Sequence, residues 1–155
     1  RLVNLAYRGE ESKRGWTTEA NFLLGDKRTD EENLRELMQT PGSVFLTFQD
    51  TNNAITGSVY LAKKDNRLYL GMLAVSPELQ AKGIGKQLIA AAENHAREQS
   101  CRSIFMRVIS LRKELINWYN KLGFRDTGLR EPLIADNKFN IPMQELEFMI
   151  MEKEI

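Results

Sequence analysis

The segment of this 155-residue chain whose residue types best suit chemistry is 80–86, with the sequence QAKGIGK. It comes directly before a run with helical periodicity, so its backbone N–H groups belong to a first helical turn and have no partner inside that helix. Gly83 and Gly85 let a ligand approach this backbone closely. Lys82 and Lys86 stand where the helix dipole would favour Asp or Glu. Together these features predict a phosphate-binding site.

The glycine spacing alone is weak evidence, because a G-x-G pair arises by accident in roughly every second chain of this length. Two other phosphate-binding motifs do not fit the same residues. A P-loop requires Gly in place of Gln80 and Ser or Thr in place of Gln87. A dinucleotide fingerprint requires Gly or Ala in place of Leu88. The segment therefore belongs to neither of these classes of nucleotide site.

The hydrophobic pattern predicts an α/β fold. Helical spacing and capping residues predict helices at 1–8, 19–24, 30–39 (with a capping box of Thr29 and Glu32), 83–99, and between Ser110 and Gly123. Strand-rich runs between turn residues occur at 44–48, 55–62, 67–75, 103–109, 124–128 and 145–151. The strand at 67–75, the helix at 83–99 and the strand at 103–109 form a βαβ unit. Such a unit implies a parallel strand pair inside a mixed sheet.

Composition is that of an ordinary single domain. The length suits one domain over residues 1–155. No apolar run approaches the roughly 20 residues that cross a bilayer, so we expect a cytoplasmic protein with no membrane partner. The net charge of +1 argues against a nucleic-acid partner. One His and one Cys cannot supply a metal-ligand cluster, so no metal is expected.

Three segments together resemble the GNAT superfamily of acyl-CoA N-acyltransferases. They are 73–77 (LAVSP), the loop 80–86 with its Q-x-x-G-x-G pattern, and 118–124 (WYNKLGF). The resemblance implies a single GNAT-like domain whose mixed, mostly antiparallel sheet contains a central parallel pair that splays apart between flanking helices. It implies acetyl-CoA as co-substrate and a primary amine of a small molecule or peptide as acceptor. The family's first strand has no counterpart before Arg1, so either it was removed from this chain or the sheet lacks that edge.

The same resemblance assigns roles to individual residues. Tyr119 matches the tyrosine that protonates the departing CoA thiolate, and packing beside Trp118 is the alternative. Arg112 stands where many members carry an asparagine that contacts pantetheine. It is expected either to reach a phosphate or to be a solvated helix residue. The remaining acyl-CoA contacts are expected from Leu73, Ala74, Val75, Gln80, Ala81, Lys82, Gly83, Ile84, Gly85 and Lys86.

The resemblance leaves the catalytic base open. An amine with a pKa near 10.4 is almost fully protonated at neutral pH, so a base would speed its attack. Many family members carry a carboxylate on the strand before the phosphate loop, but strand 67–75 has none. Glu19 is the tentative candidate, followed by Glu145 and Glu147. An ordinary surface carboxylate is the alternative for each of the three.

The acceptor is expected on the opposite side of the sheet opening, between residues 8–24 and 129–143. Acidic residues in the outer segments of the chain indicate a cationic acceptor. Two rival functions stay open, a non-catalytic acyl-CoA-binding module and an interaction protein with the same fold. The final strand offers a surface for a homodimer.

Overall fold

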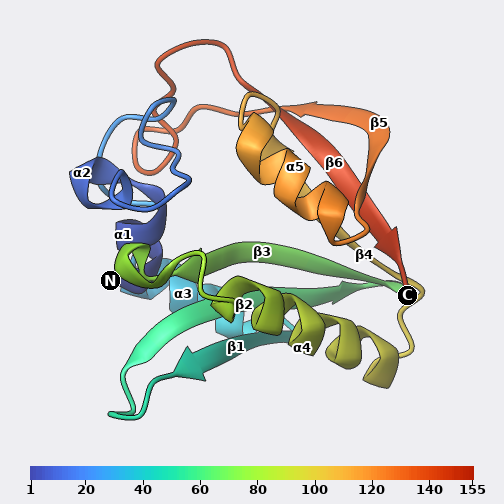
Figure 1. Ribbon diagram of the computed structural model, residues 1–155. Helices are drawn as coiled ribbons and strands as arrows, with labels where there is room; N and C mark the ends of the chain where they lie inside the picture. The colour runs from blue at the N-terminus through green and yellow to red at the C-terminus, as the bar shows by residue number, and fades with distance from the viewer.

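The computed structural model describes residues 1–155 and contains one six-stranded sheet with helices on both faces (Figure 1). The helices are α1 (Leu2–Tyr7), α2 (Gly9–Ser12), α3 (Glu31–Gln39), α4 (Ile84–Glu98) and α5 (Lys113–Lys121), with a 3-10 turn at Pro77–Leu79. The strands are β1 (Ser43–Gln49), β2 (Ile55–Lys64), β3 (Arg67–Val75), β4 (Ser103–Ile109), β5 (Arg125–Pro132) and β6 (Glu147–Glu154). None of the helices is both long and apolar enough to cross a membrane.

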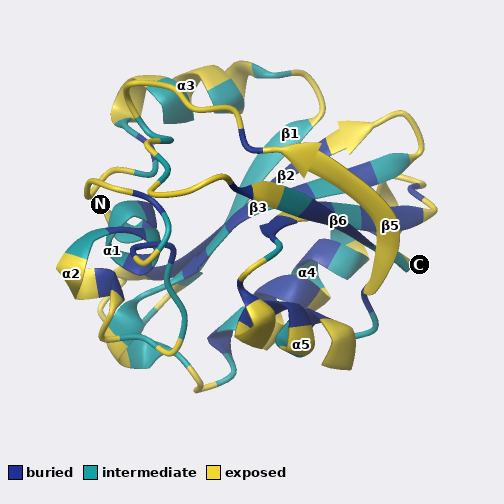
Figure 2. Cartoon of the chain, turned by 90° about the horizontal axis from the view of Figure 1, so that it is seen from above, coloured by how far each residue is buried: buried dark blue, intermediate teal, exposed yellow.

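The strand order is β1-β2-β3-β4-β6-β5. Every neighbouring pair is antiparallel except β3 and β4, which the crossover helix α4 joins in parallel. The predicted α/β fold, with a mostly antiparallel sheet and a central parallel pair, is confirmed. β5 lies at one edge of the sheet and is exposed along its whole length (Figure 2).

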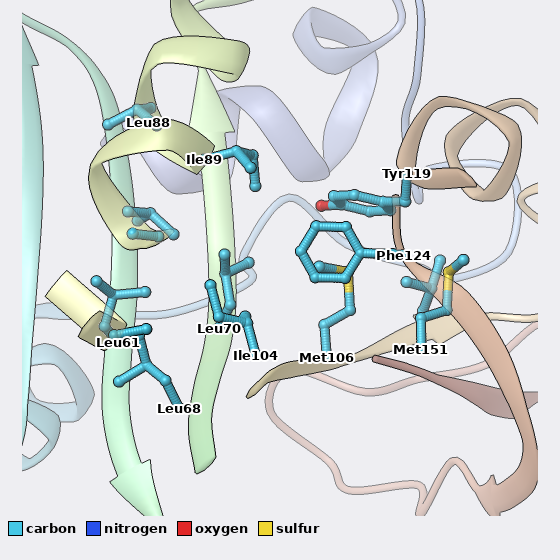
Figure 3. Packing of buried hydrophobic residues seen from close by; sticks show 14 of the residues in the cluster. Leu61, Leu68, Leu70, Leu88, Ile89, Ile104, Met106, Tyr119, Phe124 and Met151 are labelled. Atoms are coloured by element: carbon cyan, nitrogen blue, oxygen red, sulfur yellow. The ribbon is translucent and has the colours of Figure 1, made fainter. Parts of the chain in front are cut away.

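The two faces of the sheet bury separate apolar clusters. The larger cluster packs the sheet against α4 and α5, with Leu61 and Leu70 of the sheet near Leu88 of α4 (Figure 3). The smaller cluster lies on the opposite face, where Val3 and Ala6 of α1 pack on β2 and β3. Each cluster removes apolar side chains from water, which is the main favourable term in folding.

The parallel pair is joined over only three residue positions. Residues 67–69 of β3 pair with residues 103–105 of β4, and no further pairing between these strands follows. β4 instead keeps pairing with β6 along its full length, from Ser103 to Ile109. The two halves of the sheet converge near the C-terminus and diverge toward α1 (Figure 1). Beyond Tyr69, the inner edge of β3 is therefore free of a strand partner.

A β-bulge at Met72 changes which side chains of β3 face each cluster. Met72 has a φ of +48°, and the register of β2 on β3 shifts by one residue at this point. Leu70 lies in the larger cluster, whereas Met72 and Ala74 lie in the smaller one. Leu73 and Val75 consequently point to the α4 and α5 side of the sheet. In a regular strand they would share the face opposite Leu70.

Two predicted helix caps are wrong. Asp30, not Thr29, caps α3, because its side chain accepts a hydrogen bond of 2.8 Å from the backbone N–H of Asn33. Ser110 does not cap α5, which begins at Lys113 without any side-chain cap. Thr29 and Asp30 are both good capping residues, and packing selects the second, whereas α5 starts three residues after Ser110 at a residue that offers no side-chain acceptor.

The helix predicted at 19–24 is also wrong, since this segment forms only a turn. Leu23 forms an isolated β-bridge with Pro142, and the backbone N–H of Leu24 donates to the carbonyl of Ile141 at 2.9 Å. Pairing with a distant segment thus replaces the next helical hydrogen bonds. The turn holds Glu19 at the opening of the sheet.

Candidate active site

A cavity of about 410 Å³ lies beside the end of β3 that has no strand partner in β4. Its walls come from the end of β3, the start of α4, helix α5 and the N-terminal segment. Its lining residues are Ala6, Tyr7, Trp16, Thr17, Leu73, Val75, Leu79, Gln80, Ala81, Gly83, Gly85, Lys86, Arg112, Leu115, Trp118, Tyr119, Lys121 and Leu122. We call it the first cavity.

The loop before α4 presents an uncapped helix start to the first cavity. Gly83 is the N-cap residue of α4 in a left-handed conformation, with φ of +90°, and no side chain caps the helix. No acidic residue occupies the first turn. Ala81 is also left-handed, with φ of +63°. The free N–H groups of this turn can therefore bind an anion, and Lys86 adds a positive charge beside them.

Two contacts fix this loop against its surroundings. The side-chain amide of Gln80 donates to the carbonyl of Val75 at 3.0 Å, and its oxygen accepts from the N–H of Trp16 at 3.0 Å. A Cβ at Gly85 would lie 3.2 Å from the ring of Trp118, so glycine lets α4 and α5 approach closely here. Gln80 therefore joins the strand end, the loop and the N-terminal segment.

The structure brings most of the predicted cofactor residues together at the first cavity. Three of them do not line it. Ala74 is buried in the smaller cluster, Ile84 packs in the larger cluster, and Lys82 is exposed within the loop. Only the backbone groups of Ala74 and Ile84 are therefore available to a ligand. The predicted residues that line it are Leu73, Val75, Gln80, Ala81, Gly83, Gly85, Lys86, Arg112 and Tyr119.

Tyr119 is buried at the meeting point of α5 and the sheet. Its ring packs against Phe124 at 5.7 Å between centroids (Figure 3). It also packs against Trp118, at 5.1 Å between centroids. Burial, and after it the neighbouring Tyr7, raises the pKa of Tyr119 above its ordinary value. The hydroxyl therefore stays protonated at physiological pH and is a weaker acid than an exposed tyrosine, so it can donate its proton only to a strongly basic partner. The predicted core packing of Tyr119 is confirmed, and its role as general acid stays a prediction.

A second cavity of about 230 Å³ lies on the other side of the sheet opening. Its wall includes Arg8, Glu19 and Leu23 from one of the two segments between which the acceptor was predicted, and Pro132, Leu133, Ile134 and Asn140 from the other. Both cavities share part of their wall. The shared residues are Tyr7, Leu73, Arg112, Leu115 and Tyr119.

Glu19 lies in the wall of the second cavity and holds two buried guanidinium groups. Its Oε1 accepts from Nε of Arg8 at 3.1 Å, and its Oε2 accepts from Nη1 of Arg112 at 3.4 Å. All three side chains are at least nine-tenths buried. Arg112 also donates to the hydroxyl of Thr17 at 2.8 Å. The expectation that Arg112 is a solvated helix residue is therefore wrong.

The other two candidate bases lie outside both cavities. Glu145 is exposed in the loop before β6. Glu147 is exposed on β6, where it lies 3.8 Å from Arg130. Both have the position of ordinary surface carboxylates.

Replacing Glu19 by Gln is expected to lower the Tm by roughly 10 °C. Removing one partner of a buried ion pair costs about 3–5 kcal/mol, and each kcal/mol shifts the Tm of a domain of this size by roughly 2–4 °C. Thermal unfolding followed by circular dichroism measures the change. Glu10→Gln is the control, because Glu10 is 88% exposed in its pair with Lys13. Equal small shifts in both variants would contradict the structural role of Glu19.

Several cavity residues were missed from the sequence. Tyr7 lines both cavities, and burial followed by the charge of Glu19 raises its pKa to about 12. Trp16 is half exposed, and its ring lies 6.3 Å from that of Trp118. Arg28 lies in the wall of the second cavity. All three belong to the N-terminal segment, where no periodicity or motif marks a residue that faces a site.

Comparisons with known proteins agree with this geometry. Residues 10–124, well over half of the chain, match the Acetyltransferase (GNAT) family. Acetyltransferase Atu2258 of Agrobacterium fabrum is 26% identical over 88 residues, which are 57% of this chain and 63% of that protein. The chain thus spans less than two thirds of this relative's length.

Solved structures of acetyltransferases share the fold. A putative phosphinothricin N-acetyltransferase aligns with a TM-score of 0.69 and 15% identity over 99% of this chain and 90% of that one. A putative streptothricin acetyltransferase from Bacillus anthracis, in complex with acetyl coenzyme A, aligns with a TM-score of 0.65 and 22% identity. The alignment covers 78% of this chain and 67% of that one. At these identities the likeness concerns the fold. With the match over residues 10–124, the chain belongs to the GNAT acetyltransferase family.

Proposed function

We propose that the protein is an N-acetyltransferase that moves the acetyl group of acetyl-CoA to a primary amine of a small molecule or peptide. The observation that carries this proposal is the wall that the two cavities share. A thioester held in the first cavity and an amine held in the second meet at Leu73 and Tyr119. Holding two reactants in one geometry makes the attack effectively unimolecular, which supplies a large part of the rate.

The residues of the first cavity fit acetyl-CoA. The uncapped start of α4 and Lys86 suit the pyrophosphate. The inner edge of β3 from Leu73 to Val75 has no strand partner, and apart from the Val75 carbonyl, which accepts from Gln80, it suits the amides of the pantetheine arm as an added strand. Arg112 borders both cavities, whereas the loop borders only the first. We therefore assign the phosphate contact to Lys86 and place Arg112 near the reacting end.

Tyr119 acts as the general acid in this proposal. The amine nitrogen forms a bond to the thioester carbonyl carbon, and an N–H on the edge of β3 near Val75 stabilises the oxyanion. The carbon–sulfur bond then breaks, the sulfur keeps the electron pair, and Tyr119 gives its proton to the thiolate. The proton released by the amine restores the tyrosine hydroxyl through water.

Glu19 is better suited to positioning than to proton removal, because both of its oxygens already accept from guanidinium groups. We assign it to holding Arg112 in place. The Glu19→Gln variant separates the two roles. Measured well below its Tm, it keeps most of its kcat if Glu19 only positions Arg112, and loses about 100-fold if Glu19 is the base.

Acetyl-CoA at about 100 times its Kd is expected to raise the Tm by roughly 5–10 °C. Ligand linkage at that concentration adds about 2.7 kcal/mol to the stability of the folded state. Free acetate is the control and should leave the Tm unchanged. Release of the CoA thiol with a panel of amines then tests catalysis. If acetyl-CoA gives no shift, the proposal is wrong. If acetyl-CoA binds but no amine releases CoA, the protein is an acyl-CoA-binding module.

A further inference from the structure

The second cavity has a strongly basic wall. It is lined by the four arginines Arg8, Arg28, Arg107 and Arg112, and by a single acidic residue, Glu19. The acidic outer segments of the chain indicated a cationic acceptor, but the cavity itself presents the opposite charge. A low-dielectric cavity lined by one sign of charge concentrates ligands of the other sign.

Glu19 does not neutralise this wall, since its one negative charge is shared between Arg8 and Arg112. Arg8 is fully occupied by the protein. It also donates to the carbonyls of Lys27 and Phe139 and to the side chain of Asn140. Arg8 therefore has a structural role, and the excess charge of the pair lies at Arg112. The Nε of Arg112 is buried and has no hydrogen-bond partner in the protein.

Arg28 is available to a ligand. It takes part in none of the protein's ion pairs, and its guanidinium lies 5.7 Å from the ring centroid of Tyr7. Arg112 lies 5.8 Å from the same ring, so two guanidiniums that line the second cavity lie near Tyr7. Burial keeps Tyr7 a neutral phenol, with a pKa raised to about 12, so it offers them no negative charge.

Arg107 extends the basic wall along β4. Its guanidinium lies 5.1 Å from the ring centroid of Phe148 and 5.9 Å from that of Tyr69. Its one carboxylate partner is Glu131 at 3.6 Å, and both side chains are about half exposed. An exposed pair of this kind contributes little free energy. Arg107 can therefore exchange Glu131 for an anionic ligand at small cost.

We infer that the acceptor is a small amine that also carries a carboxylate or another anionic oxygen group, which Arg28 binds with help from Arg107. The inference rests on the proposed function. Apolar side chains, among them Leu23, Met106 and Leu133, line the rest of the cavity and suit an apolar portion of the acceptor. The volume of about 230 Å³ is below the usual range for drug-sized ligands, so the acceptor is small.

The basic wall also bears on the missing base. Positive charges near an ammonium group disfavour its protonated form and lower the pKa of the amine. The arginines therefore favour the neutral, nucleophilic amine, while the anionic group of the same molecule supplies the binding energy. Because the arginines lower the pKa of the acceptor amine, the site does not need a carboxylate on β3 to remove the proton of the ammonium group.

Matched amine pairs test the inference. Leucine, methionine and phenylalanine are compared with their amides and with 2-phenylethylamine and spermidine, and CoA release gives kcat/KM for each. An amino acid amide is a weaker base than the free amino acid, so more of it is neutral at physiological pH. A preference for the carboxylate therefore cannot come from amine reactivity. We expect the carboxylate form to exceed its amide by at least about tenfold in kcat/KM.

Variants locate the preference. Arg28→Gln should reduce the carboxylate-to-amide ratio to near one, and Arg107→Gln should reduce it partly. Arg35→Gln is the matched control, because Arg35 is 71% exposed on α3, outside both cavities. The acetyl-CoA shift in Tm reports whether each variant still folds and binds its cofactor. If Arg28→Gln does not fold, Arg28→Lys takes its place, and the carboxylate-to-amide ratio of kcat/KM in this variant and in the wild type tests the inference.

The outcomes separate the two claims. If acetyl-CoA gives no Tm shift, or if no amine releases CoA, the proposed function fails. If CoA is released but amides, 2-phenylethylamine or spermidine react as well as the carboxylates, the proposed acetyltransferase activity is supported. The inference of an anionic acceptor is then wrong. An unchanged ratio in folded Arg28→Gln likewise overturns the role of Arg28.

Discussion

Replacing Tyr119 by Phe is expected to reduce kcat about 100-fold while leaving the affinity for acetyl-CoA nearly unchanged. The hydroxyl is the proposed proton donor to the departing thiolate, and general acid catalysis contributes at least about 10²-fold to a rate. The Phe side chain keeps the ring contacts with Trp118 and Phe124, so the packing survives. Steady-state CoA release gives kcat, and calorimetric titration gives the affinity.

Tyr60→Phe is the matched control, because Tyr60 is a buried tyrosine of the smaller cluster that packs on Phe45 at 5.0 Å, away from both cavities. Its kcat should equal that of the wild type. The raised pKa of Tyr119 adds a second readout. Its proton is retained as the pH rises through 10, so Tyr119 contributes no falling limb to the kcat profile up to that pH. A kcat within threefold of wild type in Tyr119→Phe would leave packing as its only role.

Replacing Lys86 by Glu is expected to raise the Kd for acetyl-CoA about 100-fold at low ionic strength. Reversing one charge within about 4 Å of an anion near a protein surface changes the interaction by several kcal/mol. Lys86 is exposed at the start of α4 and has no ion-pair partner, so the substitution breaks no internal contact. The kcat at saturating acetyl-CoA should be unchanged, because the contact is made equally in the ground and transition states.

Salt and a second lysine provide the controls for this variant. The difference in Kd should shrink as ionic strength rises, since exposed charges are screened beyond about 8–10 Å at physiological salt. Lys64→Glu reverses an exposed charge at the end of β2, outside the first cavity, and should not change the Kd. Equal losses in both variants would mean that the net charge, rather than the loop, controls binding.

The features predicted best from the sequence are those that a short segment determines by itself. The bounds predicted for β3 and β4, 67–75 and 103–109, agree with the structure, because apolar alternation and flanking turn residues are local signals. The loop 80–86 was equally readable, since its lysines and glycines contradict what an isolated helix start favours. The predicted cofactor residues consequently lie together, apart from the side chains of Ala74, Lys82 and Ile84.

The acceptor side was much less predictable, because long-range contacts build it. Glu19 meets Arg8 across 11 residues and Arg112 across 93, and no spacing rule links such positions. Arg28 lies in a loop whose composition suggests only exposure, yet its guanidinium lies against Tyr7 of α1. The charge of a cavity depends on which side chains meet there, and the average charge of the surrounding segments did not reveal it.

The bulge at Met72 limits how the length of β3 can vary. One residue added or removed between Gly71 and Leu73 would exchange the faces of all residues that follow, because side chains alternate along a strand. Leu73 and Val75 would then leave the first cavity, and Ala74 would enter it. Side-chain identity can drift in this stretch within the limits of packing. The number of residues in this stretch cannot change without moving side chains between the two faces. Insertions and deletions should therefore be rarer here than in the turns at either end of the strand.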